Sequence, residues 1–256
     1  MSTPAKPFLL LSIRTEERAA LDEHAAFARF LGVSVDALPR IELGTSPLPP
    51  IDLDAWSGII LGGGAFNASD PQDKKSASQV QAEADLARLL DEVVARDFPF
   101  LGACYGIGAV GTHQGAVVDR SHPEPVGPVS VELTDAGRED PLFAGLPTAF
   151  AAYGGHKECI SMLPSHAVAL ATSAAAPVQA FRIGQHVYAT QFHPELDLDG
   201  ILTRIAVYAH YGYFDPSEQE ALGAAAAAVT VSHPMRVLHN FAARYGVPTS
   251  TAATES

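Results

Sequence analysis

Short apolar runs alternate along the chain with longer stretches in which apolar residues recur at helical spacing. Residues 8–13, 58–61 and 98–101 are almost wholly apolar, which is typical of strands buried on both faces. Residues 16–31 and 80–95 place apolar side chains every three or four positions, which predicts two amphipathic helices. The first hundred residues therefore read as strands separated by helices.

The alternation continues to the end of the chain. Further strands are predicted at 40–43, near Val117, at 129–133 and at 186–192, and further helices from Ile107 and over 202–211, 218–229 and 233–245. Strands that alternate with helices predict an α/β fold, with an open, mostly parallel twisted sheet and helices on both faces. Residues 249–256 are small and polar, so we expect a frayed tail.

Composition and charge narrow the classes of function. The 256 residues carry a formal net charge of −13, whereas binding to DNA or RNA requires a basic footprint. No stretch approaches the roughly 18 consecutive apolar residues that span a bilayer, and the run at 8–13 is too short for a secretory signal. The two cysteines, Cys104 and Cys159, make no disulfide framework. We therefore expect a protein of the reducing cytoplasm, with neither nucleic acid nor membrane as a partner.

The most informative segment is an apolar strand that ends in a G-x-C-x-G turn and runs into a helix, at residues 100–106. This is the pattern of a nucleophile elbow, in which Gly102 and Gly106 avoid clashes and Cys104 is held strained at the sheet edge. The helix N-terminus favours a thiolate and a developing oxyanion. A free cysteine is more often a small buried hydrophobe, and we interpret Cys159 in that way. The strand, the glycines and the helix together favour a nucleophile at Cys104.

A cysteine nucleophile needs a base, and the base needs a group that orients it. Among ten histidines, His193 is the best placed, because it follows the predicted strand at 186–192 and so shares the sheet edge with Cys104. Pro194 keeps the backbone extended, so Glu195 points to the same side and can accept a hydrogen bond from the imidazole. Each residue alone could be structural, Glu195 as a charge at a helix N-terminus. Beside the cysteine turn, we interpret both as functional.

Three glycines, Gly62 to Gly64, follow the predicted strand at 58–61. A phosphate-binding loop has no support, because neither G-x-x-x-x-G-K-[ST] nor G-x-G-x-x-G is present. A plain turn and an oxyanion hole remain, since glycine lets backbone N–H groups face an oxygen at close range. The loop shares the sheet edge with Cys104, so we interpret it as an oxyanion hole.

Together these segments resemble the class I, triad-type glutamine amidotransferases, in particular the amidotransferase domain of GMP synthases and its stand-alone relatives. The family's landmarks stand in its order at 59–65, 99–106 and 191–195, with weaker matches at 140–147 and 155–158. The resemblance covers about residues 8–212 and implies a flavodoxin-like fold. It implies a glutamine amidotransferase class I domain over 1–215 and leaves a C-terminal helical extension with a frayed tail over 216–256.

The resemblance also implies roles for single residues. Cys104 resembles the family's nucleophile, His193 its general base and acid, and Glu195 the residue that orients the histidine. The backbone N–H groups of Gly63 and Tyr105 resemble the oxyanion hole. Residues expected to bind substrate are Gly62, Gly64 and His156, the last in a segment similar to the one that contacts the α-amino and α-carboxylate groups of glutamine. We expect no cofactor and no metal site, because no histidine pair has ligand spacing.

Two departures from the family bear on the substrate. The family's glutamine four residues after the cysteine is Gly108 here, and its common S-G-G-P loop reads Gly-Gly-Gly-Ala. The expected reaction is hydrolysis of the glutamine side-chain amide through a γ-glutamyl thioester on Cys104, which releases glutamate and ammonia. Gly108 gives some weight to a γ-glutamyl peptide or amide hydrolase on the same fold. A complete triad disfavours a non-catalytic regulatory module, and also a chaperone or oxidative sensor with an elbow cysteine.

The expected partners follow from the same resemblance. If ammonia is passed on, we expect a separate synthetase chain to accept it, because the roughly 40 residues beyond the resemblance are too few for a synthetase domain. The alanine-rich tail packs on the core or forms a contact in a homo-oligomer, and its composition does not choose between the two.

Overall fold

Five strands form the parallel part of the central sheet. The computed structural model describes residues 6–211 and 214–246. Across the sheet, the parallel strands are β2 (Arg40–Glu42), β1 (Phe8–Ser12), β3 (Gly58–Leu61), β4 (Phe100–Ala103) and β11 (Val187–Thr190). All but β2 are buried along their whole length, as expected of strands covered on both faces. Their carboxyl ends share one edge, where the candidate residues lie.

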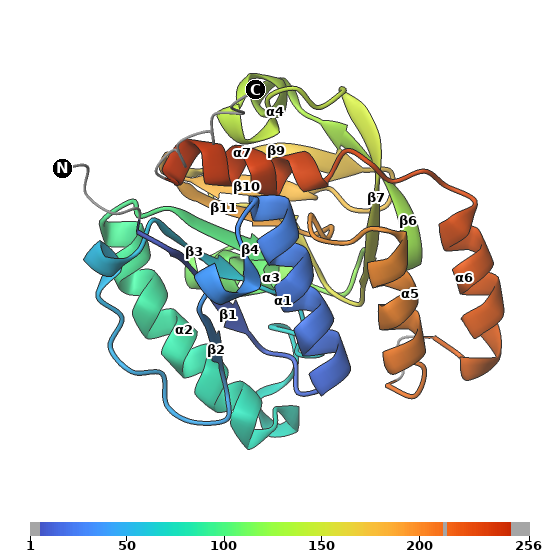
Figure 1. Cartoon of the computed structure of the whole chain (residues 1–256), viewed down its shortest axis with the longest axis horizontal. Helices are drawn as coiled ribbons and strands as arrows, with labels where there is room; N and C mark the ends of the chain where they lie inside the picture. Colours follow the sequence, from blue (N-terminus) through green and yellow to red (C-terminus); the bar gives the residue numbers. More distant parts are fainter. Residues whose placement is uncertain (1–5, 212–213, 247–256) are drawn as a thin grey trace, which may run out of the picture.

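An antiparallel part continues the sheet beyond β11 (Figure 1). Its strands, in order, are β10 (Ala180–Ile183), β9 (Ala167–Ser173), β6 (Glu124–Leu133) and β7 (Ala149–His156). Only the end of β6 is predicted from the sequence, because β7 is rich in alanine and has no branched aliphatic residue, and β9 carries only Val168 and Leu170 among alanines. Five of the nine strands lie in parallel pairs, and the predicted α/β class with an open, mostly parallel sheet is confirmed.

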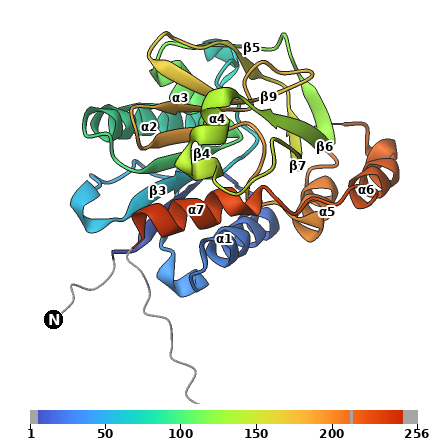
Figure 2. The ribbon, with the colours of Figure 1, turned by 90° about the horizontal axis from the view of Figure 1, so that it is seen from above.

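Helices cover both faces of this sheet (Figure 2). One face carries α2 (Ala77–Ala95) and α3 (Tyr105–His113), whose apolar side chains join one buried core. The other carries α1 (Glu17–Leu31) and α7 (Met235–Tyr245), which pack against each other and join a second core. Within the described ranges, no helix has both the length and the apolar character to cross a membrane.

Capping side chains, which periodicity does not reveal, set where two helices begin. α2 starts three residues before its predicted place because the hydroxyl of Ser76 accepts the N–H of Gln79 at 3.1 Å. α5 (Leu198–Val207) also starts early, because a carboxylate oxygen of Asp197 accepts the N–H of Gly200 at 2.9 Å. Both predicted helices are present, and the capping residue of each sets where its first turn begins.

The two C-terminal helices extend the core. α6 (Gln219–Ala227) packs beside α5 and β6, and the hydroxyl of Tyr153 donates to the carbonyl of Ala226 at 2.9 Å. α7 then crosses the face that carries α1 (Figure 2), and Phe241, fully buried, lies 5.6 Å from the ring of Phe8. We therefore propose that the described part of the predicted extension, residues 216–246, folds with the rest of the chain. The frayed tail predicted at 249–256 lies outside the described residues.

The remaining elements are short. β5 (Val117–Asp119) and β8 (Cys159–Met162) pair as a separate two-stranded sheet. The short helical segments are α4 (Asp135–Glu139) and the 3-10 turns η1 (Val35–Ala37), η2 (Leu53–Ala55), η3 (Gln72–Lys74), η4 (Pro141–Phe143) and η5 (Pro216–Glu218).

Candidate active site

Cys104 stands at the turn from β4 into α3, in a strained conformation. Its φ of 54° and ψ of −99° lie in a region that non-glycine residues rarely adopt and that is frequent at functional sites. Two backbone hydrogen bonds hold the turn: the N–H of Cys104 donates to Thr190 at 2.8 Å, and the N–H of Ile107 donates to Cys104 at 3.0 Å. The half-buried thiol is thus fixed at the N-terminus of α3, as the elbow pattern predicts.

Packing requires only one of the two glycines that flank the turn. A Cβ at Gly102 would lie 2.9 Å from the backbone of Gly106, closer than real Cβ atoms approach. A Cβ at Gly106 would lie 3.5 Å from the carbonyl oxygen of Leu61, which is an ordinary contact. The expectation that both glycines avoid a clash is therefore right for Gly102 and wrong for Gly106.

His193 reaches Cys104 from the loop after β11. The backbone N–H of His193 donates to the carbonyl oxygen of Tyr153 at 3.0 Å, and this bond holds the loop against β7. Nδ1 of the ring lies 2.7 Å from Oε1 of Glu195, and the ring lines the same hollow as Cys104. Because the carboxylate engages Nδ1, Nε2 is the ring nitrogen left to exchange a proton with a substrate or with the sulfur. The structure brings together the three residues that the sequence singled out.

The charges of these groups stabilise one another in a buried place. Burial of His193 opposes its charged form, but Glu195 and Cys104 outweigh this and raise the pKa of the imidazole to about 10. Burial also works against the charge of Glu195, whose side chain is 0% exposed, yet the charge and hydrogen bond of His193 lower the pKa of that carboxyl. Near neutral pH, the ring therefore carries a proton that it can deliver to a departing group.

Each glycine of the loop after β3 lies against a different side chain. The nearest neighbour of an added Cβ would be Oε2 of Glu23 at 2.6 Å for Gly62, Cε1 of His193 at 2.7 Å for Gly63, and Cγ1 of Ile13 at 2.4 Å for Gly64. Side chains at these positions would collide with the site, so the glycines follow from close packing. The same Cβ at Gly63 would lie 3.1 Å from Cβ of Cys104, which puts this backbone beside the thiol.

Buried charged residues lie against the glycine loop after β3. The sequence patterns do not single them out. Arg14, 4% exposed, donates from Nε to Glu23 at 2.7 Å and from Nη1 to the hydroxyl of Tyr208 at 2.9 Å. Among the described residues, Nε and Nη2 of Arg204 and Oε2 of Glu195 are buried without a hydrogen-bond partner. Arg14 directly follows β1, and that place at the strand end could have identified it. Glu23 in α1 and Arg204 in α5 lie within helices, where no sequence pattern marks them as part of a site.

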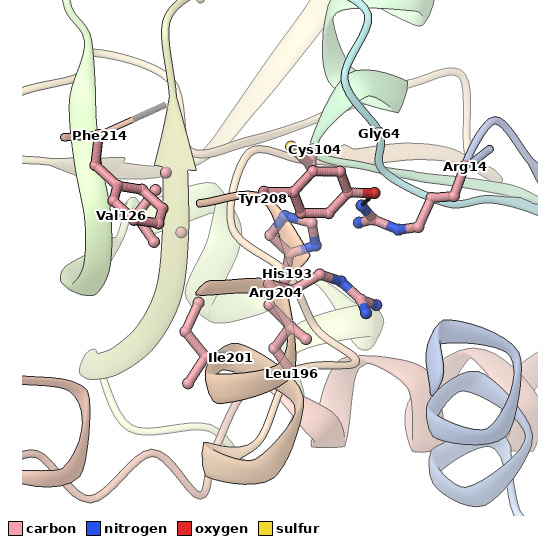
Figure 3. A pocket seen from close by; sticks show the side chains of 12 residues that line it. Arg14, Gly64, Cys104, Val126, His193, Leu196, Ile201, Arg204, Tyr208 and Phe214 are labelled. Atoms are coloured by element: carbon pink, nitrogen blue, oxygen red, sulfur yellow. Dashed lines mark hydrogen bonds between the residues drawn. The ribbon is translucent and has the colours of Figure 1, made fainter. Parts of the chain in front are cut away.

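Two hollows meet at the candidate nucleophile. The first, shown in Figure 3, encloses about 510 Å³, counting space open to solvent, and is lined by Arg14, Val126, Gly154, His193, Leu196, Ile201, Arg204, Tyr208 and Phe214. The second encloses about 270 Å³ and is lined by Phe66, Asn67, Tyr105, His156, Lys157, Glu158 and Gln191. Gly64, Cys104 and Gly155 line both. A substrate that reacts at Cys104 can thus extend to either side of the sulfur.

His156 lines the second hollow, but its side chain is already engaged. Nδ1 lies 2.8 Å from the carbonyl oxygen of Glu158, and Nε2 lies 2.8 Å from Oε2 of Glu124. The ring therefore fixes the end of β7 against β6. Both nitrogens of this ring are thus engaged within the protein, and the expectation that His156 binds substrate stays a prediction.

Glu158 occupies the space that Gly108 leaves open. A Cβ at Gly108 would lie 2.7 Å from Oε1 of Glu158. The carboxylate accepts the N–H groups of Ala68 at 2.8 Å and Ser69 at 2.7 Å, so it ties the polar segment after the glycine loop to the second hollow. The departure from the family pattern at position 108 is therefore accompanied by a buried carboxylate, and no sequence signal links the two positions.

Comparisons with known proteins identify similar sequences. The model of the family described as glutamine amidotransferase class-I matches residues 33–200. The chain is 32% identical over 171 residues, 66% of this chain and 75% of the relative, to a subunit of the glutamine-hydrolysing GMP synthase of Thermoplasma acidophilum. The corresponding subunit from Thermococcus kodakarensis is 28% identical over 169 residues, 66% of this chain and 79% of its own.

Solved structures share the fold at lower identity. A glutamine amidotransferase from Thermotoga maritima superimposes with a TM-score of 0.68 over 93% of this chain and 98% of its own, at 20% sequence identity. A second, from Methylobacillus flagellatus, gives a TM-score of 0.67 over 94% of both chains, at 16% identity. At these identities, the likeness concerns the fold alone.

The two glycines of the elbow should differ in their tolerance of a side chain. Gly102→Ala should lower the free energy of unfolding by about 1–3 kcal/mol, because the added methyl group meets the backbone of Gly106. Gly106→Ala, inside α3, should leave it unchanged or raise it by up to about 1 kcal/mol. Urea denaturation of both variants measures the difference, and equal losses of stability would contradict this account of the turn.

Glu195→Gln should lower the pKa of His193 from about 10 by roughly 1–3 units, because the partner charge is removed. The exposed Glu220→Gln on α6 is the matched control and should leave that pKa where it is. A raised histidine pKa adds stability that is complete below the pKa of an unfolded histidine and disappears as the pH rises through about 10. NMR titration of labelled imidazole measures the pKa, and an unshifted value in Glu195→Gln would show that Glu195 does not hold the proton on the ring.

Proposed function

Because the chain belongs to the class I glutamine amidotransferase family, we propose that it hydrolyses the side-chain amide of glutamine through a γ-glutamyl thioester on Cys104. The observation that supports this most directly is the alignment of three side chains at the sheet edge. The carboxylate of Glu195 engages the ring of His193 at 2.7 Å, and the ring and the side chain of Cys104 line one hollow. The proposed roles are nucleophile, base and acid, and orienting residue.

The first step is attack on the amide. Cys104 reacts as a thiolate, with its proton on His193: the sulfur bonds to the side-chain carbonyl carbon, the C=O π bond opens and the negative charge moves to the carbonyl oxygen. We assign the N–H groups of Gly63 and Tyr105 to that oxygen, because Tyr105 is the first residue of α3 and its N–H has no acceptor within the helix. Gly63 lies beside the Cys104 side chain. Each such donor is typically worth about 10²–10³ in rate.

The second step is departure of the amine. His193 gives its proton to the nitrogen, the C–N bond breaks and ammonia leaves. A water molecule, deprotonated by the now neutral ring, then attacks the thioester and releases glutamate. The raised pKa of His193 supports the first half of this cycle, because the ring enters it protonated.

The fate of the ammonia is a proposal that rests on the relatives. The similar proteins from Thermoplasma and Thermococcus are each named as one subunit of a glutamine-hydrolysing GMP synthase. We propose that the ammonia made here passes to a synthetase on a separate chain. A free, half-buried thiol at the centre of the site also needs a reducing compartment, so we place this activity in the cytoplasm.

Cleavage of other γ-glutamyl amides is a second candidate function, and one observation favours it. The family's substrate-binding glutamine is replaced by Gly108, and Glu158 fills the space instead. The residues assigned to bond making and bond breaking are unaffected by this exchange. The amide that enters the site, rather than the reaction, is therefore the property that separates the two candidates.

Cys104→Ala should lower the rate of ammonia release from glutamine by at least about 10⁴-fold, because no other group replaces the nucleophile. Cys159→Ala is the matched control: Cys159 is 1% exposed in β8, outside both hollows, and its variant should keep full activity. Ammonia and glutamate are measured together, and circular dichroism verifies that both variants fold. Undiminished turnover by Cys104→Ala would refute the proposed chemistry.

A further inference from the structure

The first hollow lies on the side of Cys104 from which a leaving group departs. His193 lines this hollow and is absent from the described lining of the second one. In the proposed reaction, the ring gives its proton to the nitrogen of the breaking amide, so that nitrogen must come within hydrogen-bond reach of the ring. The amine half of a substrate therefore enters the first hollow, and the acyl half extends past Tyr105 into the second.

The second hollow has groups that suit a γ-glutamyl acyl half. Its lining includes Lys157 and Glu158, one charge of each sign, and the acyl half carries an α-carboxylate and an α-ammonium. Oε1 of Gln191, in the same lining, is buried without a hydrogen-bond partner among the described residues. The charged end of the substrate is thus matched on that side of the sulfur.

The wall of the first hollow nearest α5 and β6 is apolar. Leu196 and Ile201, 1% and 2% exposed, belong to a small buried core, and the half-buried Val126 and Phe214 pack against that core. Figure 3 shows Val126 and Phe214 on one side of the hollow and Leu196 and Ile201 beneath His193. Arg14 pairs with Glu23, and Nη1 of Arg204 pairs with Asp22, whereas Nε and Nη2 of Arg204 have no hydrogen-bond partner among the described residues. Away from Arg204, the wall of this hollow is therefore apolar.

This hollow extends past the place of the reacting nitrogen. Its lining runs from Cys104 and His193 to Val126 and Phe214, so its apolar wall continues beyond the group that accepts the proton. Apolar surface that stays open beside a reacting group is characteristic of a binding site for an apolar part of the ligand. A substituent on the amide nitrogen would cover it.

We propose, resting on the function proposed above, that the substrates of this site include γ-glutamyl amides whose amine carries an apolar side chain, and that the first hollow binds this side chain. The sulfur of Cys104 bonds to the γ-carbonyl carbon, and the C–N bond breaks. The nitrogen takes the proton of His193 and leaves as the free amine. Water then adds to the thioester, which releases glutamate and returns the thiol, so no oxidant or further reactant is required.

The test compares two dipeptides that differ only in the side chain of the leaving amino acid. γ-Glutamyl-leucine and γ-glutamyl-glycine have the same acyl half and the same terminal carboxylate, so the ratio of their kcat/KM values reports on the apolar hollow alone. We expect γ-glutamyl-leucine to be favoured by at least about tenfold, since one methylene in an apolar pocket is worth about that much. Release of the free amino acid is measured, with glutamine assayed in parallel.

A variant that fills the hollow locates the effect. Val126→Phe places a ring in the space of the leucine side chain and should return the ratio toward one. Val117→Phe is the matched control, because Val117 is 40% exposed on β5 and lines neither hollow, so the ratio should stay as in the wild type. If Val126→Phe does not fold, the kcat/KM ratio of the two dipeptides in the wild-type protein tests the inference by itself.

The outcomes separate this inference from the function on which it rests. A ratio near one, together with hydrolysis of glutamine that requires Cys104, overturns the inference and leaves the proposed function standing. A preference for leucine that survives Cys104→Ala, or no cleavage of any of the three amides, overturns both. A preference that requires Cys104 and disappears in Val126→Phe supports both.

Discussion

The imidazole of His193 lies where a side chain at position 63 would have to be, and the rest of the site depends on that close approach. A Cβ on Gly63 would come within 2.7 Å of the ring and 3.1 Å of the Cβ of Cys104. Glycine at position 63 lets the segments after β3, β4 and β11 converge at the sheet edge, and glycine at position 102 lets β4 pass close to the first turn of α3. The backbone of Gly63 therefore lies beside the side chain of Cys104. The parallel strands bring these segments to one edge of the sheet, and the glycines allow their backbones to approach more closely than a side chain would permit.

Convergence in a buried place brings an electrostatic requirement. A charge taken out of water needs a partner, and the site meets this with pairs: His193 with Glu195 and Arg14 with Glu23. Burial opposes the charge of both cations. Glu195 with Cys104 outweighs it at His193, and Glu23 with Tyr208 outweighs it at Arg14, so the pKa of each cation is raised. The histidine is thereby kept protonated without exposure to solvent. A reaction that ends with a proton on a departing nitrogen benefits from that arrangement.

Part of the fold and of the site can be predicted from the sequence, and the remainder cannot for physical reasons. The buried parallel strands, the elbow at Cys104 and the His193–Glu195 pair all leave local patterns: an apolar run, flanking glycines, a proline between two polar residues. Contacts between distant segments leave none, and Glu158 beneath Gly108 is 50 positions away from it. The alanine-rich strand β7 has no branched aliphatic residue and β9 has only Val168 and Leu170, so most of the antiparallel part of the sheet was not predicted. The hollow beside Val126 and Phe214 likewise arises only when β6, α5 and the segment before η5 come together.

The central claim is that an acyl group passes through the sulfur of Cys104. Its most direct test is intact-protein and peptide mass spectrometry of samples quenched with acid during turnover of glutamine. The account predicts one γ-glutamyl group in thioester linkage on the peptide that contains Cys104, removed by hydroxylamine. Release of ammonia without that adduct, or with the group on another residue, would contradict it.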